Sequence, residues 1–374
     1  MIDPKSLDKV GIAIRESIAN DRELLEQMRA DVRSLKNQTH RIKPQSSTAI
    51  SLVATDGGNN QISFDPFMIQ LIRVVDSNEK EYCLEVITPN TEIEKLNETH
   101  LNSDGTGKTQ LGKMIKYLGL NSLHKLSPVF NLDTEKRDHS WVQIYREMTE
   151  WAILFALVRE SDFSSDTIIV FDGLLRSKMF ASGLFEKYQE GLEEGIKRSK
   201  KNRRNIYIVG IAKHNKILQT YRLAMAIEGI MRTKYPCYLE VSKKLEKVYK
   251  HKEYFTGSRK SEIFVAGKMF FVKFGKSPHD PIWAVDILKS QATDSGMLSS
   301  IFGHLLNDAN EGFPVPFYPQ CLQKAHEHAA LVDFDMDILQ EEIHKALREE
   351  LNEKKWEIDK LALQEMDPSR RRYQ

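Results

Sequence analysis

Two aspartates end apolar runs of the sequence, and a glycine follows each of them. Asp56 ends the run "AISLVATD" and Asp172 ends the run "TIIVFD". For either position alone a turn is the simplest interpretation, because Asp-Gly is a common turn sequence. Two carboxylates held close together repel one another unless a cation neutralises them, and hard oxygen ligands favour Mg²⁺ or Mn²⁺. The pair therefore predicts a divalent-metal site if the fold brings the two runs together.

Further side chains could complete such a site. Glu147 and Glu150 lie on one predicted helix, and Glu150 is preferred because it directly precedes the apolar run "WAILFALV", where a carboxylate needs a partner. A solvent-facing glutamate is the alternative at this position. Lys213, which ends "NIYIVGIAK", could offset the charge of a scissile phosphate. His326 could ligate a metal or transfer a proton near neutral pH.

The hydrophobic pattern indicates the elements that must position these residues. Three strand-like runs with short polar links, residues 49–56, 67–76 and 81–88, predict an antiparallel meander. A predicted helix over residues 141–160 then leads to two continuous apolar runs, which end at Gly173 and Lys213 and are typical of parallel strands covered on both faces. The predicted fold class is α/β, with an RNase H-like mixed sheet of three antiparallel strands and then parallel strands, flanked by helices.

This arrangement decides between the two interpretations of the aspartates. In an RNase H-like sheet the first and fourth strands are parallel neighbours, so Asp56 and Asp172 are expected side by side, each at the end of its strand. The metal site is then favoured over two unrelated turns. Further along, residues 261–274 predict a hairpin that turns at Ala266, Gly267 and Lys268.

Helical extensions are predicted at both ends of the chain. Apolar residues from Leu7 to Leu35 recur at steps of three, four or seven, which predicts one long amphipathic helix. The predicted domains are a helical arm over residues 1–45, an α/β domain over residues 46–333 and a charged helical tail over residues 334–374. Such apolar faces are expected to bind a second copy or a partner, unless they fold back on their own chain.

The composition is that of an ordinary soluble globular protein, with 41% hydrophobic residues, 29% charged residues and a formal net charge of +1. The apolar run at residues 151–158 is far shorter than the about 20 residues that a membrane-spanning helix needs. We therefore expect no membrane and a cytoplasmic location. Three widely spaced cysteines predict neither a disulfide framework nor a structural zinc site. The basic run "KRSKKNRR", residues 197–204, is either a solvated loop or a surface for nucleic acid.

Four short motifs resemble those of the NurA nucleases. They are "ATDGG", "FDGLL", "VGIAK" and "FYPQCLQKAH", which occur in the order and rough spacing of that family between about Ala49 and Leu331. The resemblance implies an RNase H-like nuclease domain over residues 46–333, with Mn²⁺ as the cofactor and Mg²⁺ as the alternative. It also implies cleavage of DNA as an exonuclease or a single-strand endonuclease, a homodimer, and a HerA-like hexameric ATPase as partner. The implied role is the processing of DNA ends in repair or in antiviral defence.

The resemblance also assigns residues one by one. Asp56 and Asp172 match the metal-binding aspartates of the family, Glu150 the helix glutamate, Lys213 the lysine after the fifth strand, and His326 the late histidine. The implied reaction is metal-assisted hydrolysis of phosphodiester bonds.

Three positions depart from the family pattern. Gly58 and Leu174 stand where the family usually has a serine after Asp-Gly, and Cys321 stands where a proline is common. These departures bear on loop shape and substrate choice and leave the predicted ligands in place. The competing hypothesis is a catalytically inactive RNase H-like scaffold that only binds DNA or the ATPase motor. Retention of the two aspartates, the glutamate and the lysine argues against it.

Overall fold

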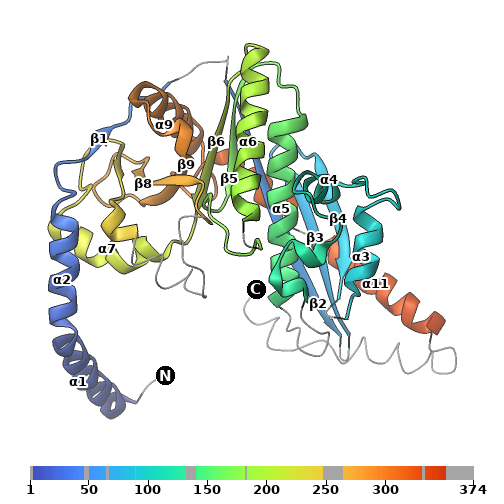
Figure 1. Ribbon diagram of the computed structural model, residues 1–374. Helices are drawn as coiled ribbons and strands as arrows, with labels where there is room; N and C mark the ends of the chain where they lie inside the picture. Colours follow the sequence, from blue (N-terminus) through green and yellow to red (C-terminus); the bar gives the residue numbers. More distant parts are fainter. Residues whose placement is uncertain are drawn as a thin grey trace.

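The computed structural model describes residues 3–45, 50–64, 67–88, 90–131, 140–181, 183–246, 264–330 and 333–350. Within these ranges nine strands form one mixed sheet in the order β1-β7-β8-β9-β6-β5-β2-β3-β4 (Figure 1). The strands are β1 (His40–Arg41), β2 (Ile50–Phe64), β3 (Phe67–Asp76), β4 (Glu81–Ile87), β5 (Asp166–Asp172), β6 (Ile206–Ala212), β7 (Cys237–Glu240), β8 (Gly267–Lys273) and β9 (Trp283–Leu288).

The half of the sheet from β4 to β6 has the predicted strand directions. β2 pairs antiparallel with β3, and β3 pairs antiparallel with β4. β5 is parallel to β2, and β6 is parallel to β5. The prediction of three antiparallel strands followed by parallel strands is confirmed, and so is the prediction that the first and fourth of these strands are neighbours.

Helices cover both faces of this sheet. Ile169 and Phe171 of β5 belong to the core that contains Trp151 of α5, whereas Ile168 and Val170 belong to the core that contains α9 and α10. Because successive residues of a strand point to opposite faces, β5 is buried on both sides. The helices are α1 (Pro4–Asn20), α2 (Arg22–Arg33), α3 (Ile93–His100), α4 (Gln110–Tyr117), α5 (Ser140–Glu160), α6 (Leu184–Lys201), α7 (Lys216–Glu228), α9 (Ser295–Asn310), α10 (Gln320–Ala329) and α11 (Asp333–Glu350).

The expectation that Asp56 closes its strand is wrong. β2 continues to Phe64 and stays paired with β3 over its whole second half. Only the pairing with β5 stops beside Asp56, at Thr55 opposite Phe171. The two glycines after Asp56 are accommodated in the strand because β3 still supplies its hydrogen-bonding partners.

The hairpin expected over residues 261–274 is also wrong within the described residues. Gly267 begins the single strand β8, which lies between β7 and β9, and it pairs with Leu288. A Cβ atom at Gly267 would lie 2.5 Å from the Cβ atom of Asp286. This glycine therefore permits a close approach of two strands and does not make a turn. Residues 261–263 lie outside the described residues.

The predicted N-terminal helix is divided at Asp21 into α1 and α2. Val32 is buried beside α7, with Leu25 and Met28 partly buried against the same core, so the C-terminal half of the apolar stripe packs on its own chain. On α1, by contrast, Ile18 is 64% exposed. Figure 1 shows α1 and α2 extending as an arm from the end of the molecule that carries β1 and α7. Of the predicted tail, residues 333–350 are helical and residues 351–374 lie outside the described residues.

Candidate metal centre

The register of two parallel strands brings Asp56 and Asp172 together. Thr55 of β2 is opposite Phe171 of β5, so the next residue of each strand is one of the two aspartates. Oxygen atoms of both carboxylates and a ring nitrogen of His326 all lie within 4.8 Å of one another. Three of the residues predicted from the sequence therefore converge at one point, although they are far apart in the chain.

His326 reaches this point from α10, which packs on β2. Its Nδ1 atom is 2.6 Å from Oδ2 of Asp56. This hydrogen bond raises the pKa of His326 above its ordinary value. Burial alone would raise the pKa of Asp56, but the hydrogen bond from His326 and the nearby charge of Lys213 outweigh it, so the pKa of Asp56 is lowered. Asp56 is therefore held as a carboxylate.

The second carboxylate has two donors of its own. Lys213 Nζ, just after β6, lies 3.0 Å from Oδ2 of Asp172, and the Tyr318 hydroxyl donates to Oδ1 at 3.2 Å. Burial and the charge of Asp56 nevertheless raise the pKa of Asp172, with Lys213 and Tyr318 acting in the opposite direction. Without a cation, one of the two aspartates is thus easy to ionise and the other is not.

Tyr318 is a site residue that the sequence argument missed. It is almost fully buried, and burial raises the pKa of its hydroxyl well above the ordinary value, so the group acts as a donor. The signal was available in the motif "FYPQCLQKAH", where Tyr318 lies eight residues before His326. Nothing in its residue type alone distinguishes it from a core tyrosine.

Glu150 lies against the backbone that follows Asp56. It is 9% exposed, and a Cβ atom at Gly57 would lie 2.0 Å from its Oε1 atom, so only glycine permits this approach. Burial raises the pKa of Glu150 well above its ordinary value. Arg146, with Nε 3.2 Å from Oε1, partly opposes this effect, whereas the charges of the two aspartates add to it. Glu150 is near the aspartates but outside the group of three potential ligands.

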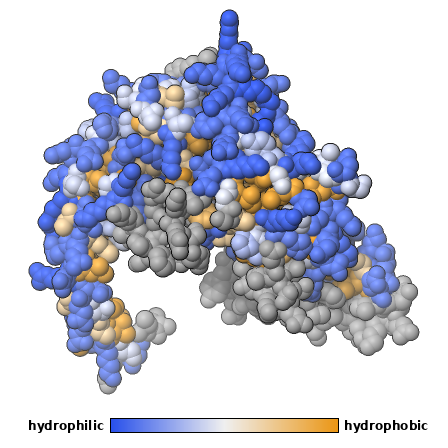
Figure 2. All heavy atoms as spheres, in the orientation of Figure 1, coloured by the Kyte–Doolittle hydropathy of each residue, from blue (hydrophilic) through white to orange (hydrophobic). Residues whose placement is uncertain are grey.

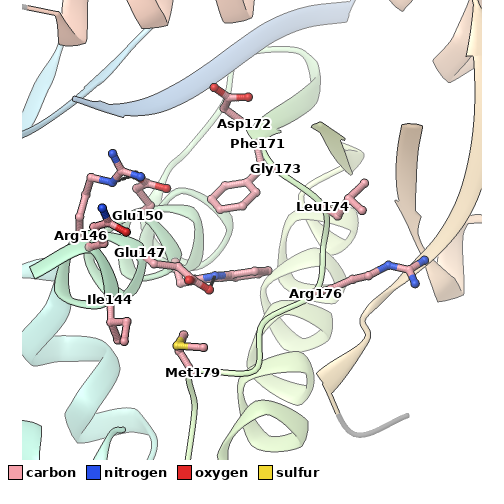
Figure 3. A pocket seen from close by; sticks show the side chains of 12 residues that line it. Ile144, Arg146, Glu147, Glu150, Phe171, Asp172, Gly173, Leu174, Arg176 and Met179 are labelled. Atoms are coloured by element: carbon pink, nitrogen blue, oxygen red, sulfur yellow. Dashed lines mark hydrogen bonds and ion pairs between the residues drawn. The ribbon is translucent and has the colours of Figure 1, made fainter. Parts of the chain in front are cut away.

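Glu147, the alternative one turn earlier, has other partners. Its Oε1 atom accepts hydrogen bonds from Ser177 Oγ at 2.6 Å and from Trp151 Nε1 at 3.3 Å. Burial raises the pKa of Glu147, and these two hydrogen bonds oppose the effect only in part. Both glutamates line a cavity of about 420 Å³ that also includes Asp172. In Figure 3 the carboxylate of Asp172 lies at one end of this group of side chains, and Glu147 lies away from it.

Arg176 also lines this cavity, but its guanidinium is paired with acidic residues outside the candidate metal centre. Its guanidinium binds both carboxylate oxygens of Asp286 on β9, at 2.7 and 2.8 Å, and lies 3.5 Å from Glu246. Figure 3 shows the guanidinium pointing away from the other labelled side chains. This buried pair connects the segment after β5 to β9 and thereby fixes the backbone just beyond Asp172.

The basic run at residues 197–204 lies away from this centre. It ends α6 and precedes β6, whereas Lys213 follows the other end of β6. A strand of seven residues spans about 20 Å. The structure thus places the run beyond the opposite ends of the central strands from the two aspartates.

Several solved NurA structures match this chain at low sequence identity. A NurA nuclease from Sulfolobus solfataricus is 13% identical, with 93% of this chain and 98% of that chain covered and a TM-score of 0.42. A NurA bound to dAMP and manganese is 11% identical, with 88% and 94% covered and a TM-score of 0.39. A NurA with manganese is 11% identical, with 93% and 98% covered and a TM-score of 0.39. This chain resembles the NurA nucleases.

The resemblance indicated by the four sequence motifs thus names the same family as these solved structures. A scan against known protein families gave no match, and neither did a search of curated proteins. Among the helices in the described part of the chain, none is both long and apolar enough to cross a membrane.

Proposed function

We propose that this protein is a metal-dependent deoxyribonuclease that hydrolyses phosphodiester bonds at the centre formed by Asp56, Asp172 and His326. The observation that carries the proposal is the convergence of ligand atoms from these three residues within 4.8 Å. They come from two neighbouring parallel strands and a helix packed on them, so the fold holds them in place. Sites built on regular elements keep the geometry that catalysis needs.

The donor set fits a divalent ion of intermediate hardness. Two carboxylates suit Mg²⁺ or Mn²⁺, and an imidazole nitrogen shifts the preference toward Mn²⁺. Burial and the charge of Asp56 raise the pKa of Asp172. Keeping both carboxylates ionised without a cation therefore costs free energy. A bound ion would neutralise the pair, activate water and stabilise the charge that develops on the phosphate.

The neighbouring residues have distinct proposed roles. Lys213 orients Asp172 and supplies a positive charge at the position where a scissile phosphate approaches. Tyr318 fixes the second oxygen of the same carboxylate. Burial raises the pKa of Glu150 in the metal-free protein, and a bound cation would lower it, so Glu150 would serve as a further ligand beside the three residues of the centre.

The finer assignments rest on the resemblance to NurA in the sequence motifs. They are an RNase H-like fold for the domain, activity on DNA ends, a homodimer, and a HerA-like hexameric ATPase as partner in repair or antiviral defence. The exposed apolar residues of α1 support association with a second copy or a partner, because an isolated helix gains most of its stability by packing such a face.

The test is cleavage of end-labelled linear DNA by the purified protein with Mn²⁺, with Mg²⁺, and with a chelator. Asp56→Asn and Asp172→Asn should each lower the rate by about a hundredfold or more, the effect of losing a group that stabilises transition-state charge. Asp162→Asn is the matched control, because this exposed aspartate lies beyond the other end of β5. DNA binding without cleavage, in Mn²⁺ and with an ATPase partner present, would favour the inactive scaffold.

A further inference from the structure

The segment between α9 and α10 carries an exposed aromatic side chain close to the candidate metal centre. Its sequence is "GFPVPFYP", residues 312–319. Phe313 is 77% exposed, more than any other large hydrophobic residue in the described part of the chain. Tyr318, five residues later, is buried and donates to Asp172 of the centre. One short segment therefore contributes to the metal site and also presents an apolar ring to solvent.

Side chains of α10 hold the backbone of this segment in place. Gln320 Oε1 accepts the N–H of Phe313 at 2.8 Å, and Gln323 Oε1 accepts the N–H of Val315 at 2.8 Å. The Nε2 atom of Gln323 donates to the carbonyl oxygens of Val315 and Tyr318, at 3.0 and 2.9 Å. Three prolines restrict the φ angles of the same segment. The exposed ring is thus carried on a preorganised backbone, which lowers the entropy that binding must overcome.

The second phenylalanine of the segment has a structural role. Phe317 is half-buried against the core that contains α9 and α10, and its backbone lies in the left-handed region, with a φ of 59°. Its carbonyl oxygen accepts from Trp283 Nε1 at 2.6 Å. A bulky residue adopts this conformation only where its surroundings fix it. Packing thus accounts for Phe317, whereas Phe313 belongs to none of the hydrophobic cores formed by the described residues.

The carboxylates of the metal centre are poorly accessible. The side chains of Asp56 and Asp172 are 9% and 18% exposed. A scissile phosphate must come close to these atoms to reach a metal ion that they hold. The complementary strand of a duplex crowds this approach, and a single strand does not. Unpairing costs free energy, which DNA-binding proteins can offset with apolar side chains inserted between base steps.

Phe313 is near enough to act on a strand that enters the centre. Five residues of extended chain span at most about 18 Å, so the Cα atoms of Phe313 and Tyr318 lie no farther apart than that. Successive base pairs of a duplex rise by about 3.4 Å. The ring can therefore act only on roughly the first five base pairs beside the cleaved bond.

We propose that Phe313 is a strand-separating residue. Its ring stacks on the last base pair that remains closed at a duplex end, and one strand of that end passes on to the metal centre. Every base has a flat apolar face, so this contact requires no particular sequence. The short link to Tyr318 favours a base over a protein partner, because the substrate must come within this distance of the centre. The purpose of the residue rests on the proposed nuclease function, but strand separation itself does not require cleavage.

The first test compares the cleavage of two DNA duplexes of equal length in Mn²⁺. One is blunt, and in the other the terminal base pairs are mismatched, so that its strands are already apart. Phe313→Ala should lower the cleavage rate of the blunt duplex by about tenfold, the order of effect expected from the loss of one base-stacking contact. The rate on the mismatched duplex should stay unchanged. Phe313→Tyr keeps a ring and should match the wild-type protein on both duplexes.

The second test needs no cleavage. A blunt duplex with the fluorescent base analogue aminopurine near one end is titrated with protein in chelator, and the fluorescence rises when this base leaves the stack. The wild-type protein and Phe313→Tyr should produce the rise, and Phe313→Ala should not. Leu84→Ala is the control, because Leu84 is another exposed apolar residue, 52% exposed on β4. Thermal unfolding of each variant shows whether it is folded.

The two tests distinguish strand separation from the nuclease function. Equal loss of cleavage on both duplexes, or a wild-type rate of Phe313→Ala on the blunt duplex, would overturn strand separation. The latter result requires a wild-type protein that cleaves DNA and so leaves the nuclease assignment standing. A fluorescence rise that depends on the ring of Phe313, in a protein that does not cleave DNA, would retain strand separation and overturn the nuclease assignment. Absence of the rise with the wild-type protein would overturn strand separation in either case.

Discussion

At the scale of single residues, the candidate metal centre contains two carboxylates whose pKa values are shifted in opposite directions. Asp56 is kept ionised by His326, whereas burial and the charge of Asp56 make Asp172 harder to ionise. A buried acid whose pKa is raised costs stability as the pH rises above its ordinary, unfolded-state pKa, and the cost is complete once the pH exceeds the raised value. The metal-free protein therefore carries a repulsion between the two aspartates that a bound cation would relieve.

Asp172→Asn should separate metal binding from stability. In chelator at neutral pH the variant should unfold at a higher temperature than the wild-type protein, because a buried charge is gone while Lys213 can still donate to the amide oxygen. In excess Mn²⁺ the order should reverse, since only the wild-type protein gains the binding free energy of the ion. Thermal unfolding in both buffers measures this. A variant that Mn²⁺ stabilises as much as it stabilises the wild-type protein would show that Asp172 is not a ligand.

The contact between His326 and Asp56 predicts a pH dependence. The pKa of His326 is raised above its ordinary 6.5, so its stabilisation is fully present below 6.5 and is lost as the pH rises through the raised value. In chelator, the difference in unfolding free energy between wild type and His326→Gln should therefore shrink from about pH 6 to about pH 8.5. Urea unfolding at both pH values measures it. In an Asp56→Asn background the pH dependence should vanish, and its persistence would assign it to another group.

The two glutamates of α5 give a direct comparison. Glu150→Gln should reduce both Mn²⁺ affinity and cleavage, because Glu150 lies against Gly57 beside the aspartates. Glu147→Gln should retain both, since a glutamine oxygen can still accept from Ser177 and Trp151. Calorimetric titration with Mn²⁺ and the cleavage assay measure the two effects. The opposite ranking would place the functional carboxylate one helical turn earlier.

At the scale of elements, the sequence predicted the part of the fold that positions the site. Continuous apolar strands such as β5 indicate a parallel neighbour, and the register of β5 with β2 then brings Asp56 and Asp172 together. The course of β2 beyond Asp56 was not predictable, because Asp-Gly-Gly is also typical of a turn. What decides between the two is the pairing with β3, a contact that local pattern does not contain. The partners of Tyr318 were hidden for the same reason.

Gly57→Ala tests the contact between β2 and α5. The added Cβ atom would lie 2.0 Å from Oε1 of Glu150, so the flexible end of that side chain must move while the backbone stays. We expect a large loss of cleavage with little change in thermal stability. Gly11→Ala is the control, because a Cβ atom there meets nothing within 4 Å. Addition of Glu150→Asp, with its shorter side chain, should restore part of the activity in the Gly57→Ala background. Normal activity of the single variant would contradict the proposed role of Glu150.

At the scale of the whole molecule, α1 is left uncovered by the described body of the protein, whereas α2 packs against α7. Figure 2 shows orange, hydrophobic atoms along the arm formed by α1 and α2. Ile14 and Ile18 of α1 are 52% and 64% exposed, whereas Val32 of α2 is fully buried. The sequence pattern is the same in both helices, so periodicity alone could not tell which half of the stripe the chain itself covers.

We expect α1 to hold two copies of the protein together. Ile14→Asp combined with Ile18→Asp should convert a dimer into a monomer at micromolar concentration, because it places two charges in an apolar interface. Light scattering measures the mass. The control is Lys9→Asp, which adds an acidic group to the same helix without removing apolar surface. A wild-type protein that is monomeric under these conditions would leave α1 to a different partner.

The strand pairing described above also bears on how the chain folds. Asp56 and His326 are 270 residues apart, and the pairing of β2 with β5 joins residues 116 apart, so the ligands meet only after long loops have closed. Since such long-range contacts are costly to form early, we expect this site to form after the transition state of folding. Saturating Mn²⁺ should then slow unfolding and leave the refolding rate unchanged, which stopped-flow measurements of both rates can check. The ion would then stabilise the folded protein without accelerating its folding.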